Sequence, residues 1–112
     1  MANTFKLKTK TKEGVTTVGI YTAPSSTTTV IIGVTLANTT GAGIHVGLGI
    51  TRPSADVSKE DISLIKDVPI PQGSSFEFMA GNKLVLETED TVTVESDTAN
   101  SLDVALTIKE QT

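Results

Sequence analysis

Short runs in which apolar and polar residues alternate cover most of this 112-residue chain, and this two-residue period is typical of half-buried β-strands. No segment keeps the 3.6-residue period of an amphipathic helix. Gly, Pro, Asn and Ser separate the runs, and these residues favour turns. The pattern therefore predicts an all-β protein, an antiparallel β-sandwich or jelly-roll-like barrel of eight to nine short strands.

The expected strands and their connections can be placed along the chain. The predicted strands are 5–12, 15–21, 28–37, 43–51, 62–66, 75–79, 83–87, 91–95 and 102–108. The apolar centre of 28–37 predicts a middle strand covered on both faces, with Gly33 at a bulge or at a close approach of another backbone. Residues 88–90 are predicted to close a hairpin. Pro69 lacks a backbone N–H, so regular pairing is expected to stop before it.

Length and composition predict one domain with a core of small side chains. The chain is near the common size of a single domain. Aromatic residues make up only 4% of it, so the core must come from Val, Ile, Leu and Ala, which fit the layer of about 10 Å between two packed sheets. We assign residues 1–14 to an N-terminal strand or arm and residues 15–112 to a single β-sandwich domain. Within that domain, 52–61 is predicted as a loop, which is favoured over the alternative of a helical turn over 58–61 capped by Ser58.

Charge and missing residue types exclude several classes of function. The formal charge is −4 and Arg52 is the only arginine, so a nucleic-acid partner is not expected. The chain has no Cys, which removes disulfides and cysteine-ligated zinc and fits assembly in a reducing cytoplasm. No apolar run approaches the roughly 18 residues of a membrane span, and the N-terminus lacks an apolar signal-peptide core. Neither a membrane partner nor a secretion signal is expected.

Few side chains suggest catalysis. A catalytic His45 would need a nucleophile and an orienting acid beside it, so we interpret this single histidine as a surface or interface residue. Carboxylates gather late in the chain, at Glu87, Glu89, Asp90, Glu95 and Asp97. Their spacing is not that of a calcium loop, so a solvated acidic face is favoured over a metal site or a small hydrolase. We predict no enzyme activity, no catalytic residue, no metal and no cofactor.

The alternation of lysine with other residues in 5–12 is the sharpest functional signal. Lysines about 7 Å apart fall on one face of the predicted strand, and Phe5 and Leu7 fall on the other. The strand is positive, whereas the rest of the chain is strongly negative. Lysines on an edge strand can prevent unwanted sheet pairing; alternatively, the strand docks on an acidic neighbour. The candidate partner interface comprises Phe5, Lys6, Leu7, Lys8, Lys10 and Lys12.

Six segments, through their order and spacing, resemble a group of small structural proteins of tailed bacteriophage particles. They are YTAP at 21–24, IGVTLANT at 32–39, LIKDVPIPQGSS at 64–75, GNKLVLE at 81–87, SD at 96–97 and SLDV at 101–104. Two features depart from the pattern. Glu89 stands before Asp90 where such proteins often have Gly, and the loop 52–61 is longer than expected.

The resemblance implies a non-enzymatic, all-β virion component present in many copies. One role is a capsid decoration or cement protein on the capsid surface that bridges and stabilises major capsid subunits, because weak contacts add by avidity over a lattice. A homo-oligomer is expected, and a trimer would suit the local threefold points of such a lattice. The alternative is a tail, baseplate or fibre-associated adaptor or binding module. The scarcity of Tyr and Trp anchors favours the capsid. Assembly would take place in the cytoplasm of the bacterial host.

Overall fold

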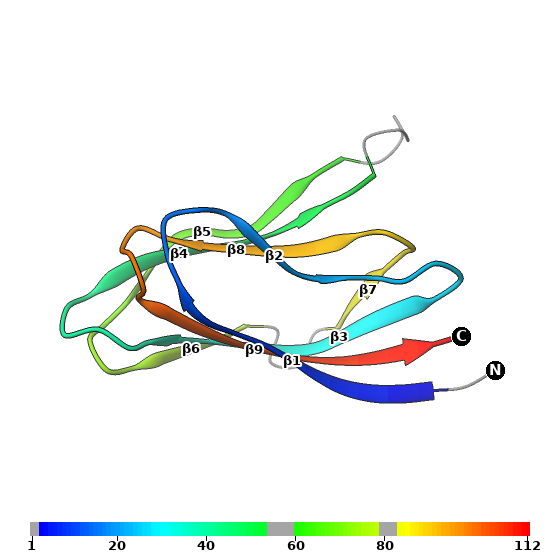
Figure 1. Cartoon of the computed structure of the whole chain (residues 1–112), viewed down its shortest axis with the longest axis horizontal. Coiled ribbons are helices and arrows are strands. Elements are labelled where there is room, and N and C mark those ends of the chain that lie inside the picture. Colours follow the sequence, from blue (N-terminus) through cyan, green and yellow to red (C-terminus); the bar gives the residue numbers. More distant parts are fainter. Residues whose placement is uncertain (1–2, 54–59, 79–82) are drawn as a thin grey trace.

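The computed structural model describes residues 3–53, 60–78 and 83–112, which form two antiparallel sheets packed face to face (Figure 1). The strands are β1 (Asn3–Glu13), β2 (Val18–Thr22), β3 (Thr28–Asn38), β4 (Ile44–Thr51), β5 (Ile62–Ile70), β6 (Ser75–Phe78), β7 (Leu84–Leu86), β8 (Thr91–Ser96) and β9 (Leu102–Gln111). The predicted all-β sandwich is confirmed. No helix long and apolar enough to cross a membrane occurs in these ranges.

The strand order is that of a jelly roll. One sheet has the order β1-β9-β3-β6, with β7 also pairing with β3, and the other has the order β2-β8-β4-β5. The pairs are nested, because β1 pairs with β9, β2 with β8, β3 with β6 and β7, and β4 with β5. The chain is thus one long antiparallel hairpin rolled into two layers, which is the double Greek-key arrangement.

The core lies between the two sheets and consists mainly of branched aliphatic side chains. Alternate residues of β4 and β9 supply much of it, as their sequence pattern predicted. These residues are Ile44, Val46, Leu48, Ile50, Leu102, Val104, Leu106 and Ile108, and all of them are buried. Tyr21 is the one aromatic side chain among the buried core residues of the described ranges.

The central strand β3 is correctly predicted in position but not in burial. It lies between β9 and the short strands β6 and β7. The pairing with β9 shifts between Ile31 and Gly33, so the bulge expected at Gly33 is confirmed. Its inward residues are buried, whereas most of its outward residues are only half-buried. The prediction that both faces are covered is wrong because no third layer packs outside this sheet in the described part of the chain.

Pairing in β5 continues through Pro69, contrary to the prediction. Pro69 faces His45 in the ladder between β5 and β4, and β5 ends at Ile70. A proline is tolerated here because β5 is the edge strand of its sheet, where an N–H that faces outward has no ladder partner to lose.

The predicted hairpin at 88–90 is also wrong, since β7 and β8 belong to different sheets. The segment is a tight turn in which Asp90 N donates to the carbonyl of Glu87 at 3.0 Å and Glu89 has a φ of 69°. Backbone hydrogen bonds of 2.9 Å join Ala23 to Glu89 and to Asp90. These bonds hold the turn in which the chain passes from β7 in one sheet to β8 in the other. The alternative of a helical turn at 58–61 falls largely outside the described residues.

Candidate functional site

The predicted interface strand β1 is an edge strand of the five-stranded sheet. It pairs with β9 from Asn3 opposite Gln111 to Glu13 opposite Leu102. The N-terminal segment 1–14 is therefore built into the sandwich along nearly its whole described length. At 11 residues, β1 is also longer than the other edge strands β2, β5, β6 and β7. Its outer edge offers the longest row of backbone groups to a partner.

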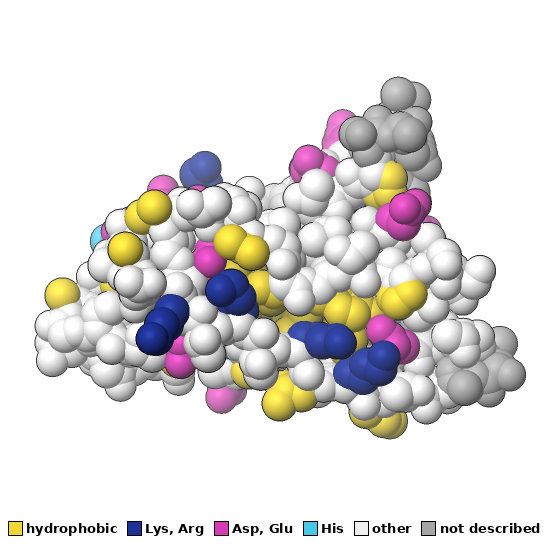
Figure 2. All heavy atoms as spheres, viewed as in Figure 1, with side chains coloured by type: hydrophobic (Ala, Val, Ile, Leu, Met, Phe, Trp, Pro, Cys, Tyr) yellow, Lys and Arg dark blue, Asp and Glu magenta, His cyan; other side chains and the backbone are white. Residues whose placement is uncertain are grey.

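The structure divides the predicted interface residues between two surfaces. Lys6, Lys8 and Lys10 lie opposite Ile108, Leu106 and Val104. Because paired residues share a face, these lysines point to the inner side of the sheet, along the open side of the sandwich. Figure 2 shows dark-blue lysine side chains in a row there, beside exposed yellow apolar surface.

Phe5 and Leu7 point the other way, onto the outer face of the same sheet. Their side chains are 69% and 63% exposed. Across the sheet, Phe5 faces Lys109, which faces Val30, which faces Val85. Val85 is 58% exposed. We call Phe5, Leu7, Val30 and Val85 the outer apolar surface. The sequence did not predict that Val85 belongs to this surface, because a sequence does not show which strands are neighbours.

The lysine row ends earlier than predicted. A bulge interrupts the pairing of β1 with β9 between Lys10 and Glu13, and Lys12 has a φ of 55°. The bulge reverses the alternation, so Glu13 rather than Lys12 faces inward, opposite the buried Leu102. The predicted four-lysine row is therefore a row of three, followed by a buried carboxyl group.

A hydrogen-bonded chain anchors the first lysine of the row. Lys6 Nζ lies 2.8 Å from Glu110 Oε1, and Tyr21 donates its hydroxyl hydrogen to Glu110 Oε2 at 2.6 Å. Tyr21 Oη is also 2.8 Å from Thr29 Oγ1. The bonds from Lys6 and Tyr21 lower the pKa of Glu110, while burial and then the bond to Glu110 raise the pKa of Tyr21 to about 12. Sequence pattern had predicted no role for Glu110.

Lys8 and Lys10 are half-buried and, within the described residues, form no ion pair. Lys10 Nζ donates to the carbonyl of Thr11 at 3.2 Å. Each is opposite a buried residue of β9, Lys8 facing Leu106 and Lys10 facing Val104. The charge of Lys8 helps to lower the pKa of Glu110 and that of Lys10 acts on Glu13, but within the described part of the chain neither lysine forms an ion pair that a partner would have to break.

Burial raises the pKa of Glu13 above its ordinary value of 4.5. The residue is 3% exposed, and its Oε2 is the buried side-chain atom that lacks a hydrogen-bond partner among the described residues. Because the pKa of Glu13 is higher in the folded state, its proton contributes to the free energy of unfolding, and this contribution is complete below pH 4.5. The contribution is lost as the pH rises through the pKa of the folded state.

Replacing Glu13 by glutamine is accordingly expected to stabilise the protein by about 1 kcal/mol at pH 7, because the charge that burial disfavours is removed. The gain over the wild type should shrink toward zero as the pH falls to about 4. Denaturant unfolding of both proteins between these pH values measures it. The lowered pKa of Glu110 makes stability change with pH in the opposite direction, but it does so equally in the wild type and the variant. It therefore cancels when the two proteins are compared at the same pH. A gain that stays constant with pH would contradict this account of Glu13.

The other side chains considered for chemistry are dispersed. His45 Nδ1 lies 3.2 Å from Asp97 Oδ2, and both side chains are exposed. Arg52 forms ion pairs with Glu87 and Asp90 at the other end of the sandwich. Asp97 thus lies with His45, and Glu87 and Asp90 lie with Arg52, so the late carboxylates do not form one site. No three His, Asp or Glu side chains come together as a metal site in the described ranges.

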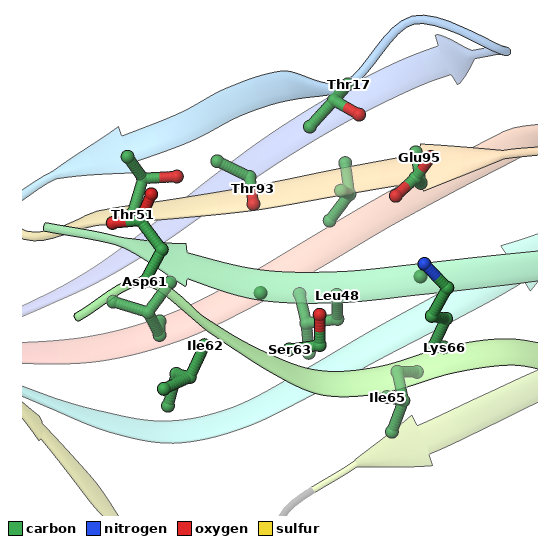
Figure 3. Close-up of a pocket in the computed structure, with 14 residues that line it drawn as sticks. Thr17, Leu48, Thr51, Asp61, Ile62, Ser63, Ile65, Lys66, Thr93 and Glu95 are labelled. Atoms are coloured by element: carbon green, nitrogen blue, oxygen red, sulfur yellow. The ribbon is translucent and has the colours of Figure 1, made fainter.

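A polar groove follows β4 on the outer face of the four-stranded sheet (Figure 3). Two adjoining hollows of about 210 and 110 Å³ form it, and both are lined by Gly47, Lys66 and Glu95. Figure 3 shows Glu95 on β8 and Lys66 on β5, on either side of β4. The hydroxyls of Thr93 and Ser63 add to the walls. The groove carries both polar hydrogen-bonding groups and charge.

Two glycines form the floor of this groove for different reasons. A Cβ on Gly49 would lie 2.7 Å from the carbonyl oxygen of Ile62, so packing of β5 requires glycine there. The three atoms nearest to a Cβ on Gly47 all belong to the Glu95 side chain, and the first of them is 3.2 Å away. That flexible side chain could move. The sequence pattern placed Gly47 and Gly49 on the outward face of this strand but did not indicate a groove.

Comparison with known proteins identifies the fold and nothing narrower. No protein-family model matches the sequence, and no curated protein shows significant similarity to it. A chain of the T13 viral particle of infectious bursal disease virus has a similar structure, with a TM-score of 0.60 and 10% identity, over 96% of this chain and 30% of the viral one. This chain spans less than a third of that viral chain.

Two further solved structures show weaker likeness. A chain of the infectious bursal disease virus Gx strain gives a TM-score of 0.48 at 12% identity, over 96% of this chain and 37% of the viral one. A Bacillus endospore appendage protein gives 0.47 at 20% identity, over 96% of this chain and 85% of the other.

Proposed function

We propose that this chain is a structural protein of a bacteriophage virion that decorates the capsid and bridges neighbouring major capsid subunits. The observation that carries the proposal is the outer apolar surface. It places Phe5 and Leu7, both more than half exposed, on one face of a sheet that ends in a long edge strand. Apolar side chains gathered on one face mark a surface that a partner covers.

The energetics of this surface suit a protein that binds a lattice. Burying a Phe or Leu side chain contributes about 1.5–3 kcal/mol, which is modest for a single contact between subunits. Contacts repeated over a particle add through avidity. The jelly-roll fold, shared with a chain of a viral particle, is compatible with such a role. In this role the chain works through its contacts, with no catalytic step and no cofactor.

Locating the chain on intact particles tests the proposal. Tailed phage particles whose genome encodes this chain would be purified, and the chain identified in them by mass spectrometry and cryo-electron microscopy. Jelly-roll density at junctions between major capsid subunits supports the proposal. Absence of the chain from purified particles would contradict it.

Density on the tail, baseplate or fibre would instead establish the alternative, an adaptor or binding module at that place. One observation favours keeping this alternative. The polar groove along β4 is a hollow lined by Lys66, Thr93 and Ser63, and ligand sites are typically hollows with a few placed polar groups.

The substitution Leu7→Asp is expected to weaken binding to particles that lack the chain by at least about tenfold, because a charge replaces apolar contact. Val15→Asp is the matched control, since Val15 is also 63% exposed but lies outside the outer apolar surface. Occupancy on particles, measured by co-sedimentation, should fall for the first variant alone. Equal occupancy of both variants would show that another surface makes the contact.

A further inference from the structure

We infer that copies of this protein associate head to tail, with the lysine row of one copy lying along the groove on β4 of the next. This deepens the proposed function, because it names one partner of the cationic edge. It uses a surface separate from the outer apolar surface. An experiment can therefore contradict the head-to-tail contact without contradicting the proposed capsid contact, and the reverse.

The first support is the charge of the groove. Its two hollows are lined by four acidic residues, one lysine and one histidine, and the histidine contacts one of the acids: Asp61, Glu95, Asp67, Asp97, Lys66 and His45, with His45 Nδ1 3.2 Å from Asp97 Oδ2. Within the described residues no ion pair engages Glu95 or Asp67. The groove is therefore negative, whereas on the β1 edge Lys8 and Lys10 form no ion pair within the described residues. Opposite charges on two surfaces of one chain favour contact between copies.

The second support is the space in the groove. Close backbone packing explains the glycine at 49, whereas at 47 the three atoms nearest to a Cβ all belong to the Glu95 side chain. The Glu95 side chain lies over Gly47, and the two hollows of about 210 and 110 Å³ that adjoin it leave room for a long side chain. A lysine can lie there with its stem against the floor and its ammonium group near the carboxylates. Glu95 and Asp97 are two residues apart, and so are Lys8 and Lys10.

The third support excludes the simplest alternative between copies. A twofold axis that joins two β1 edges in one continuous antiparallel sheet would keep the inner faces together. Each lysine row would then lie directly against the other, and like charges opposite each other in a sheet are destabilising. A symmetric dimer through β1 is therefore disfavoured. Head-to-tail contact leaves one free surface at each end, so it produces rings or open chains.

Charge reversal on each surface tests the inference by sedimentation velocity. The edge variant is Lys8→Glu/Lys10→Glu, and the groove variant is Glu95→Lys/Asp67→Asn, in which asparagine tolerates the φ of 54° at this position. We expect wild-type association at about 0.05 M salt that weakens by about 0.5 M salt. Each variant alone should associate at least about tenfold more weakly.

An equimolar mixture of the two variants should restore association to within about threefold of wild type, because each reversed surface then meets an opposite charge. The control Lys83→Glu/Lys109→Glu changes the net charge as much as the edge variant and should associate like wild type. If a reversal prevents folding, the neutral changes Lys8→Gln/Lys10→Gln and Glu95→Gln replace it, each expected to weaken association.

A wild-type protein that stays monomeric at millimolar concentration in low salt would overturn the inference, and so would a folded mixture that does not reassociate. Binding of a soluble polysaccharide in the groove without self-association would assign the groove to a different ligand and also overturn it. None of these results bears on whether Leu7 contacts the capsid.

Discussion

Replacement of Asn38 by aspartate is expected to lower the free energy of unfolding by about 3–5 kcal/mol at pH 7. Asn38 is 3% exposed. Its Nδ2 donates to the carbonyl oxygens of Ala42, Ile70 and Pro71 at 2.7, 3.0 and 3.2 Å, and its Oδ1 accepts from the backbone N of Thr40 at 2.9 Å. One amide thus joins the end of β3 to two loops. Aspartate keeps the acceptor but places a buried negative charge against three carbonyl oxygens.

The pH dependence of the Asn38→Asp variant identifies the cause. Once protonated, the introduced carboxyl group can donate one hydrogen bond, so the deficit should be smaller at about pH 4 than at pH 7. Denaturant unfolding at both pH values measures the difference. Asn100→Asp makes the same chemical change at an exposed position and should alter stability by less than about 0.5 kcal/mol. Equal stability of the two variants at pH 7 would show that the bonds of Asn38 contribute little.

Truncation of Leu106 to alanine is expected to destabilise the fold by about 2–5 kcal/mol. Leu106 has no exposed surface, and it lies in a row across the sheet between Lys8 and Val34. The lost methyl groups would leave a cavity in the inner layer, under the aliphatic stem of Lys8. Paired strands on both sides hold the backbone of β9 in place, so the cavity can collapse only partly.

Thr107 provides the control because its side chain is exposed on the opposite face of β9. Thr107→Ala should change the free energy of unfolding by less than about 0.5 kcal/mol. Thermal and denaturant unfolding compare the two variants. A small effect of Leu106→Ala, within about 1 kcal/mol of the control, would mean that the two layers repack around the lost volume.

Local pattern was enough to predict where the strands lie. All nine expected strands occur, because a period of two forces alternate side chains onto one face and burial selects the apolar one. The bulge at Gly33 was also predictable. Errors arose where the answer depends on a neighbouring strand: Pro69 is tolerated because β5 is an edge, and 88–90 crosses between sheets because β7 pairs with β3.

In the candidate interface, too, local pattern predicted some features and neighbouring strands decided the others. The two faces of β1 were visible in the sequence, but which face points inward depends on its pairing with β9. The same pairing contains the bulge that makes Glu13, and not Lys12, the next inward-facing residue after Lys10. Glu110 and Val85 were not predicted, since each joins a surface only across strands distant in sequence.

The sequence by itself determined that the chain is an all-β sandwich, because strand periodicity, turn residues and side-chain burial are properties of neighbouring residues. Only the tertiary structure decided which edge stays open, which faces carry apolar or charged groups, and that a groove follows β4. These features depend on strand order and register, which arise from contacts between residues far apart in the chain. A local sequence pattern does not determine those contacts.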